Sequence, residues 1–146
     1  MKVVLQRAKN ASVRVENEQV GAITSGLVLL VGIHEEDTKE DMEWICDKIL
    51  KMRIFDDEDG KMNLSVRDVN GELLLISQFT LYGDATKGNR PSYIEAAGHE
   101  KAEKLYEQMI RYFKQNSDLN IESGTFGAYM DVQLTNDGPV TIVLDK

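Results

Sequence analysis

Hydrophobic and polar residues alternate near the start of the chain in the way that strands require. We expect residues 2–16 to form a strand or a bent pair, because their second half alternates cleanly between the two classes. Residues 17–18 predict a turn into 19–24, and Ser-Gly at 25–26 predicts a second turn. The run 27–31 is apolar on both faces and predicts a central strand. Three early strands with short connections favour an antiparallel meander.

Two later segments carry apolar residues at helical spacing. Residues 38–41 have the sequence of a capping box, and the apolar residues behind it recur at steps of three, four, seven and eight. Cys46 lies on this apolar stripe, so the pattern favours a small buried hydrophobe over a reactive thiol. A second capping-box sequence at 92–95 precedes another apolar stripe, which predicts a long helix over 99–115.

Turn signals separate the remaining segments. The acidic run 56–60 resembles a calcium loop, but two of the required carboxylates are missing, so we expect an acidic turn. Asn-Gly at 70–71 is a hairpin signal, and it leads into an interior strand over 72–79. Gly, Asp and Thr make 82–89 a loop. The other expected strands begin at 121–125 and cover 127–134 and 140–144, with a turn at 136–139.

These elements predict one α+β domain over residues 1–146. We expect a mostly antiparallel, barrel-like β-sheet with two main α-helices packed on it. A chain of 146 residues is long enough to bury a core of its own. No repeat, linker or low-complexity tract divides it.

Charge and composition narrow the class of protein. With 25 acidic and 17 basic residues the formal net charge is -8, and most of it comes from residues 35–59. A net negative charge disfavours binding to nucleic acid, because phosphate contacts need Lys and Arg. If a polyanion binds, residues 87–114, which have a small excess of positive charge, are the better candidate for the contact. A single cysteine excludes an internal disulfide framework. No membrane span or signal peptide is evident, so we expect a cytoplasmic protein with no membrane partner.

The usual catalytic sets are absent. His34 and His99 are the only histidines, and with one cysteine they predict no metal site; we expect both to face solvent. Neither a nucleophile elbow nor a phosphate-cradling glycine loop is present, so no cofactor is expected.

Two short segments carry candidate chemistry. Residues 77–80, Ser-Gln-Phe-Thr, end an apolar strand; they form either an ordinary strand end or the mouth of a ligand site. Gly138-Pro139 forms either an ordinary turn or, with a cis bond, a segment that holds successive carbonyls in a fixed direction.

At these residues the sequence closely resembles the D-aminoacyl-tRNA deacylase family of homodimeric editing enzymes. The matching pieces occur in the family's order and span essentially the whole chain. They are Gln-Arg-Ala at 6–8, Ser-Gln-Phe-Thr-Leu at 77–81, Lys-Gly-Asn-Arg-Pro-Ser at 87–92, Phe-Gly-Ala-Tyr-Met at 126–130 and Asn-Asp-Gly-Pro-Val-Thr at 136–141.

The resemblance implies hydrolysis of the ester that joins a D-amino acid to the terminal adenosine of tRNA. It also implies removal of glycine mischarged onto alanine tRNA, and active sites at the interface of a homodimer. The implied substrate-binding residues are Ser77, Gln78, Phe79 and Thr80 of one subunit with Gly138 and Pro139 of the other, and Arg7 is implied to orient that dipeptide.

Physical reasoning adds a catalytic hypothesis for Phe79 and Thr80. Their backbone N–H groups are suited to an oxyanion, and the ribose 2′-hydroxyl of the tRNA can place the water. Thr80 then positions the substrate; as a covalent nucleophile it needs a neighbouring base that the sequence does not offer. Carbonyls of Gly138-Pro139 that occupy the space of an L side chain reject L substrates and admit D residues and glycine.

Two other classes of function remain open at this point. One is a non-catalytic module on the same fold that binds an RNA end or a D-amino acid, since the chain has no acid–base set. The other is a threonine-dependent hydrolase of a different ester or peptide.

Overall fold

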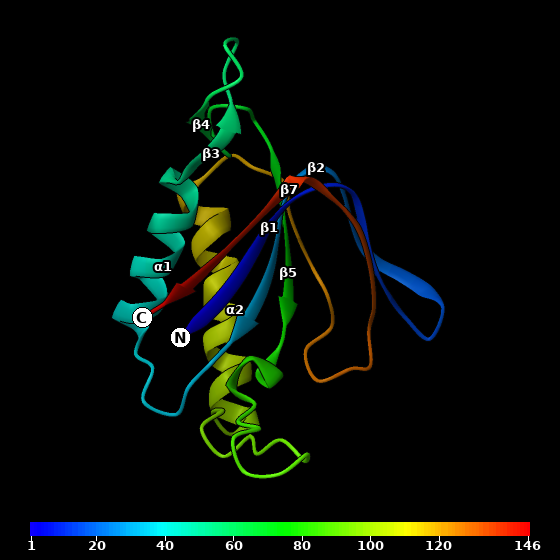
Figure 1. Cartoon of the computed structure of the whole chain (residues 1–146), viewed down its shortest axis with the longest axis vertical. Helices are drawn as coiled ribbons and strands as arrows, with labels where there is room; N and C mark the ends of the chain where they lie inside the picture. Colours follow the sequence, from blue (N-terminus) through cyan, green and yellow to red (C-terminus); the bar gives the residue numbers. More distant parts are fainter.

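A five-stranded sheet forms the centre of the computed structural model, which describes all 146 residues (Figure 1). β1 pairs antiparallel with β2 and β7, whereas β5 pairs parallel with β2 and β6. The strands lie in the order β6 (Ile121–Ser123), β5 (Glu72–Ser77), β2 (Glu18–Gly32), β1 (Lys2–Val15) and β7 (Asp131–Asp145). The fold class is therefore α+β as expected, but the sheet is mixed and open, because β6 and β7 end it as unpaired edges. The expected barrel is wrong.

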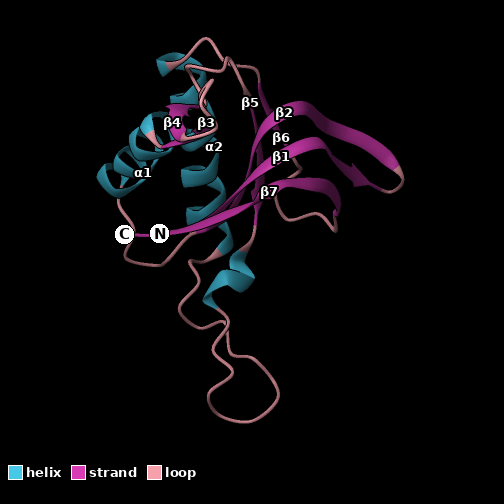
Figure 2. Cartoon of the chain, turned by 45° about the horizontal axis from the view of Figure 1, so that its top comes forward, coloured by secondary structure: helices cyan, strands magenta, loops and turns pink.

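Both helices cover the same face of this sheet (Figures 1 and 2). They are α1 (Lys39–Lys51) and α2 (His99–Asn116), close to the two expected spans. A small separate hairpin of β3 (Arg53–Asp56) and β4 (Met62–Ser65) follows α1, with the acidic turn at its tip. Sequence patterning missed both short strands. The chain ends lie side by side at the same edge of the molecule (Figure 1).

The capping box at the start of α1 is confirmed. The Thr38 hydroxyl accepts a hydrogen bond from the Asp41 N–H, and the Asp41 carboxylate accepts one from the Thr38 N–H. The Thr38 hydroxyl also donates to the Asp41 carboxylate, and this bond, followed by the one from the Thr38 N–H, lowers the pKa of Asp41. The second capping box is wrong: α2 begins at His99 after Gly98, with no side-chain cap, and 92–95 lie outside the helix.

β2 is one continuous strand, which corrects the expected turn at 25–26. Gly26 has a φ of +158°, and a Cβ atom there would lie 1.9 Å from the Glu72 carbonyl oxygen. The glycine therefore serves the close approach of β5 to β2 and does not reverse the chain. The Asn-Gly at 70–71 is a turn with a positive φ at Asn70, but it joins β4 to β5, which do not pair with each other, so it forms no hairpin.

β7 likewise replaces two expected strands. Its two halves both pair with β1: Gln6 faces Thr141, and Ala8 faces Asn136. Residues 137–140 therefore stand opposite Arg7 alone, as an enlarged bulge in a continuing strand. The composition of 136–139 suits a turn, but the pairing on both sides keeps the strand direction.

Apolar residues gather on both faces of the sheet. The larger cluster lies between the sheet and the helices and includes Cys46, fully buried as predicted. A smaller cluster on the opposite face packs under Met130, Val132 and Leu134 of the returning chain. The sheet therefore buries apolar side chains on both of its faces. Neither helix has the length and apolarity needed to cross a membrane.

Candidate active site

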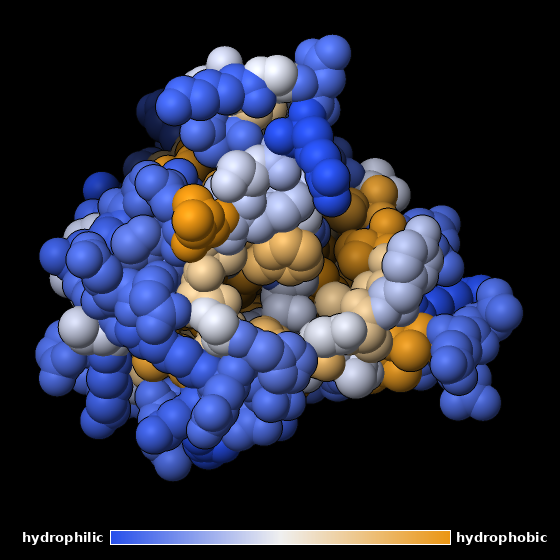
Figure 3. All heavy atoms as spheres, turned by 90° about the horizontal axis from the view of Figure 1, so that it is seen from below, coloured by the Kyte–Doolittle hydropathy of each residue, from blue (hydrophilic) through white to orange (hydrophobic).

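A cavity of about 620 Å³ opens where β5 ends, between the start of α2 and the segment 126–130. The view from below shows apolar residues gathered around a hollow, with hydrophilic residues surrounding them (Figure 3). The residues that line the cavity are Val31, Ile33, Ile76, Ser77, Gln78, Phe79, Thr80, Ala97, His99, Ala102, Phe126, Gly127, Ala128, Tyr129, Met130 and Val132. All of the expected residues 77–80 are among them.

The polar wall of the cavity arises because the chain changes conformation at the end of β5. After Ser77 it enters a short 3₁₀ turn, η1 (Phe79–Tyr82), whose first N–H groups have no partner within the turn. The N–H groups of Phe79 and Thr80 donate to no other group of the chain. Tyr82 anchors the turn in the core, where burial raises the pKa of its hydroxyl. Two backbone donors are thus free beside the cavity.

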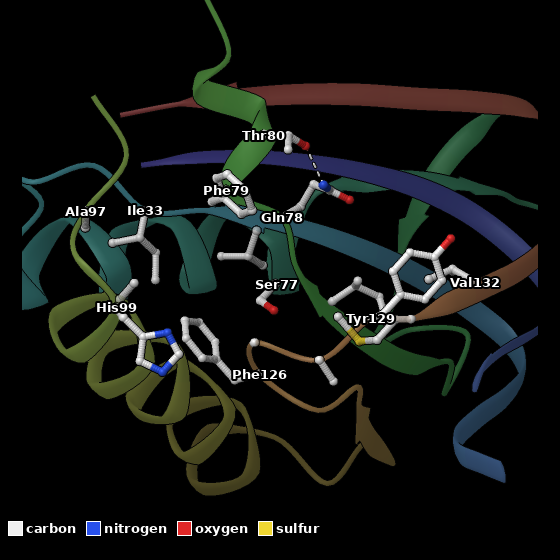
Figure 4. Close-up of a pocket in the computed structure, with 16 residues that line it drawn as sticks. Ile33, Ser77, Gln78, Phe79, Thr80, Ala97, His99, Phe126, Tyr129 and Val132 are labelled. Atoms are coloured by element: carbon white, nitrogen blue, oxygen red, sulfur yellow. Dashed lines mark hydrogen bonds between the residues drawn. The ribbon is translucent and has the colours of Figure 1, made fainter. Parts of the chain in front are cut away.

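Thr80 presents its hydroxyl without a basic neighbour. Its Oγ1 accepts a hydrogen bond from the Gln78 side-chain amide, drawn as a dashed line in Figure 4. An amide N–H cannot remove a proton from the hydroxyl. His99 lies on the other side of the cavity in the same view, beside Phe126. The arrangement suits a positioning role for Thr80 better than a nucleophilic one.

The wall opposite Thr80 was not assigned to the site from the sequence. His99 was expected to face solvent, and its side chain is largely exposed, yet it lines the cavity and packs edge-on against Phe126 at 5.2 Å between ring centroids. Tyr129 stands at the rim with 87% of its surface exposed. The only signal in the sequence was the motif at 126–130, which carried the resemblance but no assigned role.

Gly138 and Pro139 lie outside this cavity in the single chain. Both are exposed, and the peptide bond between them is cis. Gly138 has a φ of +134°, and a Cβ atom there would lie 2.9 Å from Val140 Cγ2 and 3.1 Å from Arg7 Nη2. Only glycine fits that position without a shift of its neighbours. The structure therefore brings 77–80 together but leaves 138–139 as a separate exposed projection.

Arg7 holds the base of this projection. It is only 7% exposed; its Nε donates to the Asp137 carbonyl at 2.9 Å and its Nη1 to the Ile54 carbonyl at 2.8 Å. On the other side, the Asn136 side chain accepts from the Val140 N–H at 2.9 Å. Arg7 thus fastens the bulge to β1, and Asn136 ties its two ends together. The resemblance implies this orienting role for Arg7.

The site as a whole combines apolar walls, hydroxyl groups and free backbone donors, with no acid–base pair at its polar end. No group of three or more His, Cys, Asp or Glu side chains is placed to hold a metal ion. Such a site suits a substrate that is already reactive, with electrostatic help at an oxyanion as the main contribution of the protein.

Comparison with known proteins places the molecule among hydrolases that act on ester bonds. A family model described as D-Tyr-tRNA(Tyr) deacylase matches residues 4–145. The chain therefore belongs to the D-Tyr-tRNA(Tyr) deacylase family.

Curated relatives match along the full chain. The D-aminoacyl-tRNA deacylase of Halalkalibacterium halodurans is 59% identical over 146 residues, covering 100% of this chain and 99% of the relative. That of Thermosipho africanus is 56% identical, covering 100% and 97%.

Solved structures share the fold. One named c-Myc DNA Unwinding Element Binding Protein has a TM-score of 0.95 at 44% identity, covering 100% of this chain and 99% of the other. A second, titled as a probable eukaryotic D-amino acid tRNA deacylase, has a TM-score of 0.84 at 17% identity, which shows the fold alone; it covers 99% and 98%.

Proposed function

We propose that this protein hydrolyses the ester of D-aminoacyl-tRNA and releases a free D-amino acid and tRNA. The observation that carries the proposal is the cavity at the end of β5, where Ser77–Thr80 place polar groups and free N–H donors against apolar walls. Family membership and the names of the full-length relatives support the choice of substrate. Glycine mischarged onto alanine tRNA is a second substrate.

The chemistry needs little from side chains because an aminoacyl ester is already activated. Water attacks the ester carbonyl carbon, and the N–H groups of Phe79 and Thr80 stabilise the resulting oxyanion. The bond to the ribose oxygen then breaks, that oxygen takes a proton, and the amino acid leaves as its carboxylic acid. The neighbouring ribose 2′-hydroxyl places the water, while Gln78 and Thr80 orient the ester.

Selection between mirror-image substrates falls to a second copy of the chain. In this proposal the homodimer places Gly138-Pro139 of one subunit at the cavity of the other. Its carbonyl groups then occupy the space of an L side chain, so L substrates clash, whereas D residues and glycine enter. The exposure of the dipeptide, its separation from the chain's own cavity and its fastening by Arg7 support this arrangement.

Turnover separates this proposal from a binding module on the same fold. With D-tyrosyl-tRNA in hundredfold excess over the protein, we expect every charged tRNA to be deacylated, because product leaves the site after each cycle. A binding module would retain the charged tRNA at a fixed ratio to protein and release no amino acid above the uncatalysed rate. That second result would remove the enzymatic proposal.

A further inference from the structure

A basic loop stands at the end of the molecule that also holds the cavity. We define it as residues 85–91; it extends at the bottom of Figures 1 and 2. Asp84 and Ser92 close its base with two backbone hydrogen bonds of 2.8 Å. Lys87 and Arg90 in the loop are exposed, and neither forms an ion pair with an acidic residue.

Both ends of the basic loop are attached to the polar wall of the cavity. On one side the Gly83 N–H donates to the Thr80 carbonyl at 2.9 Å. On the other, the Tyr93 ring packs edge-on against Phe79 at 5.1 Å between centroids. Lys87 lies four residues beyond Gly83, so the chain between them spans at most about 14 Å. Arg90 lies three residues before Tyr93, so its backbone is within about 11 Å of the residue that packs on Phe79. Short stretches of chain thus tie both cations to the polar wall.

The local charge differs in sign from that of the whole protein. The net charge is -8, yet from Ala85 to Ile94 the chain carries two cations and no acid. Asp84 at the loop base already accepts a hydrogen bond from the Thr86 N–H, which lowers its pKa and keeps it anionic; Glu95 follows the run. Six of the 17 Lys and Arg residues form ion pairs, as Lys9 does with Asp137, whereas Lys87 and Arg90 form none. A polyanion approaching this acidic protein thus meets free positive charge beside the cavity.

We infer that the basic loop binds the phosphate backbone of the single-stranded RNA end that leads to the nucleotide in the cavity. This inference rests on the proposed function and adds to it a docking surface for the tRNA. Lys87 and Arg90 contact phosphates and read no base, so they contribute affinity for any tRNA and take no part in the ester chemistry.

The test compares two substrates that contain the same ester, one with a phosphate backbone and one without. One is D-tyrosyl-tRNA; the other is the D-tyrosyl ester of adenosine, which carries no phosphate. For Lys87→Ala/Arg90→Ala we expect KM for the charged tRNA to rise about tenfold at low salt, with kcat unchanged and with unchanged turnover of the adenosine ester. Because the variant loses two phosphate contacts to a single strand, the slope of log KM against log salt concentration should also decrease by about 1.4.

A matched variant controls for lost charge alone. Arg53 and Lys61 are exposed, form no ion pair, and belong to the β3–β4 hairpin at the opposite end of the molecule (Figure 1). Arg53→Ala/Lys61→Ala removes the same charge, and we expect KM and its salt dependence to stay near those of the unaltered protein. Arg90→Lys keeps the charge and should retain most of the affinity.

Binding of uncharged tRNA, followed by fluorescence anisotropy, keeps this inference separable from the proposed function. If the unaltered protein hydrolyses neither ester, the proposed function fails, while weaker tRNA binding by the loop variant still supports the docking surface. An unchanged KM and salt slope, or an equal loss on both substrates, would overturn the inference.

Discussion

At the scale of single residues, the site has free backbone donors but no base beside its threonine hydroxyl. Thr80 has an amide for a neighbour where a nucleophilic hydroxyl needs a base. The polar interruption of an apolar strand at 77–80 drew attention to this segment but left an ordinary strand end open, and the family resemblance then assigned the segment to a substrate site. His99 was not, since whether a helix-start histidine faces bulk water or a cavity depends on Phe126, which is distant in sequence.

Replacing Thr80 separates positioning from nucleophilic attack. For Thr80→Ala we expect kcat for D-tyrosyl-tRNA to fall about tenfold to a hundredfold, because the oxyanion donors are backbone groups and remain. When the unaltered protein is given D-tyrosyl-tRNA with a terminal 2′-deoxyribose, its activity should fall by more than the Thr80→Ala substitution causes. Complete loss in Thr80→Ala with full activity on the 2′-deoxy substrate would instead indicate a covalent threonine.

Arg7 gives a second prediction, in which stability and selectivity change together. Arg7→Ala leaves the Ile54 and Asp137 carbonyls without their donor, so the free energy of unfolding should fall by about 2–3 kcal/mol. Because the bulge is then held less rigidly, the Arg7→Ala variant should also hydrolyse L-tyrosyl-tRNA faster than the unaltered protein does.

Lys9→Ala is the control for Arg7. It removes only an exposed ion pair with Asp137, so chemical denaturation should show a loss below about 1 kcal/mol. Equal losses in the two variants would contradict the role given to Arg7.

At the scale of elements, local signals predicted helices better than sheet topology. The apolar stripes and the Thr38 capping box placed both helices, because such signals lie within one turn of the chain. The sheet depends on pairing between distant segments. Gly26 and the bulge at 137–140 look like turns locally, yet each lies within a strand whose neighbours keep it extended.

The capping box of α1 can be tested by stability and by pH. Thr38→Ala should lower the free energy of unfolding by about 1 kcal/mol. The pKa of Asp41 is lowered in the folded state, so its contribution is present above the ordinary carboxyl pKa and is lost as pH falls through the lower, folded value.

In the same variant, NMR titration should find the pKa of Asp41 returned toward its ordinary value. A pKa that stays low without the Thr38 hydroxyl would show that another group holds it.

At the scale of the whole molecule, the account needs two chains. The cavity and the Gly138-Pro139 projection occupy different parts of one chain, and β7 ends the sheet as an open edge. No reasoning from one sequence derives how copies meet, so only the family resemblance suggested the shared site.

Dilution tests that requirement. Sedimentation and specific activity should be measured over the same dilution series, and we expect chiral selectivity to fall in step with the fraction of dimer. A monomer that keeps both activity and selectivity would show that each chain has a complete site.

The most direct measurement of the central claim is the ratio of kcat/KM for D-tyrosyl-tRNA to that for L-tyrosyl-tRNA, taken with the unaltered protein at low salt. The account predicts rapid release of the D-amino acid and negligible release of the L form. Comparable rates for the two would contradict it.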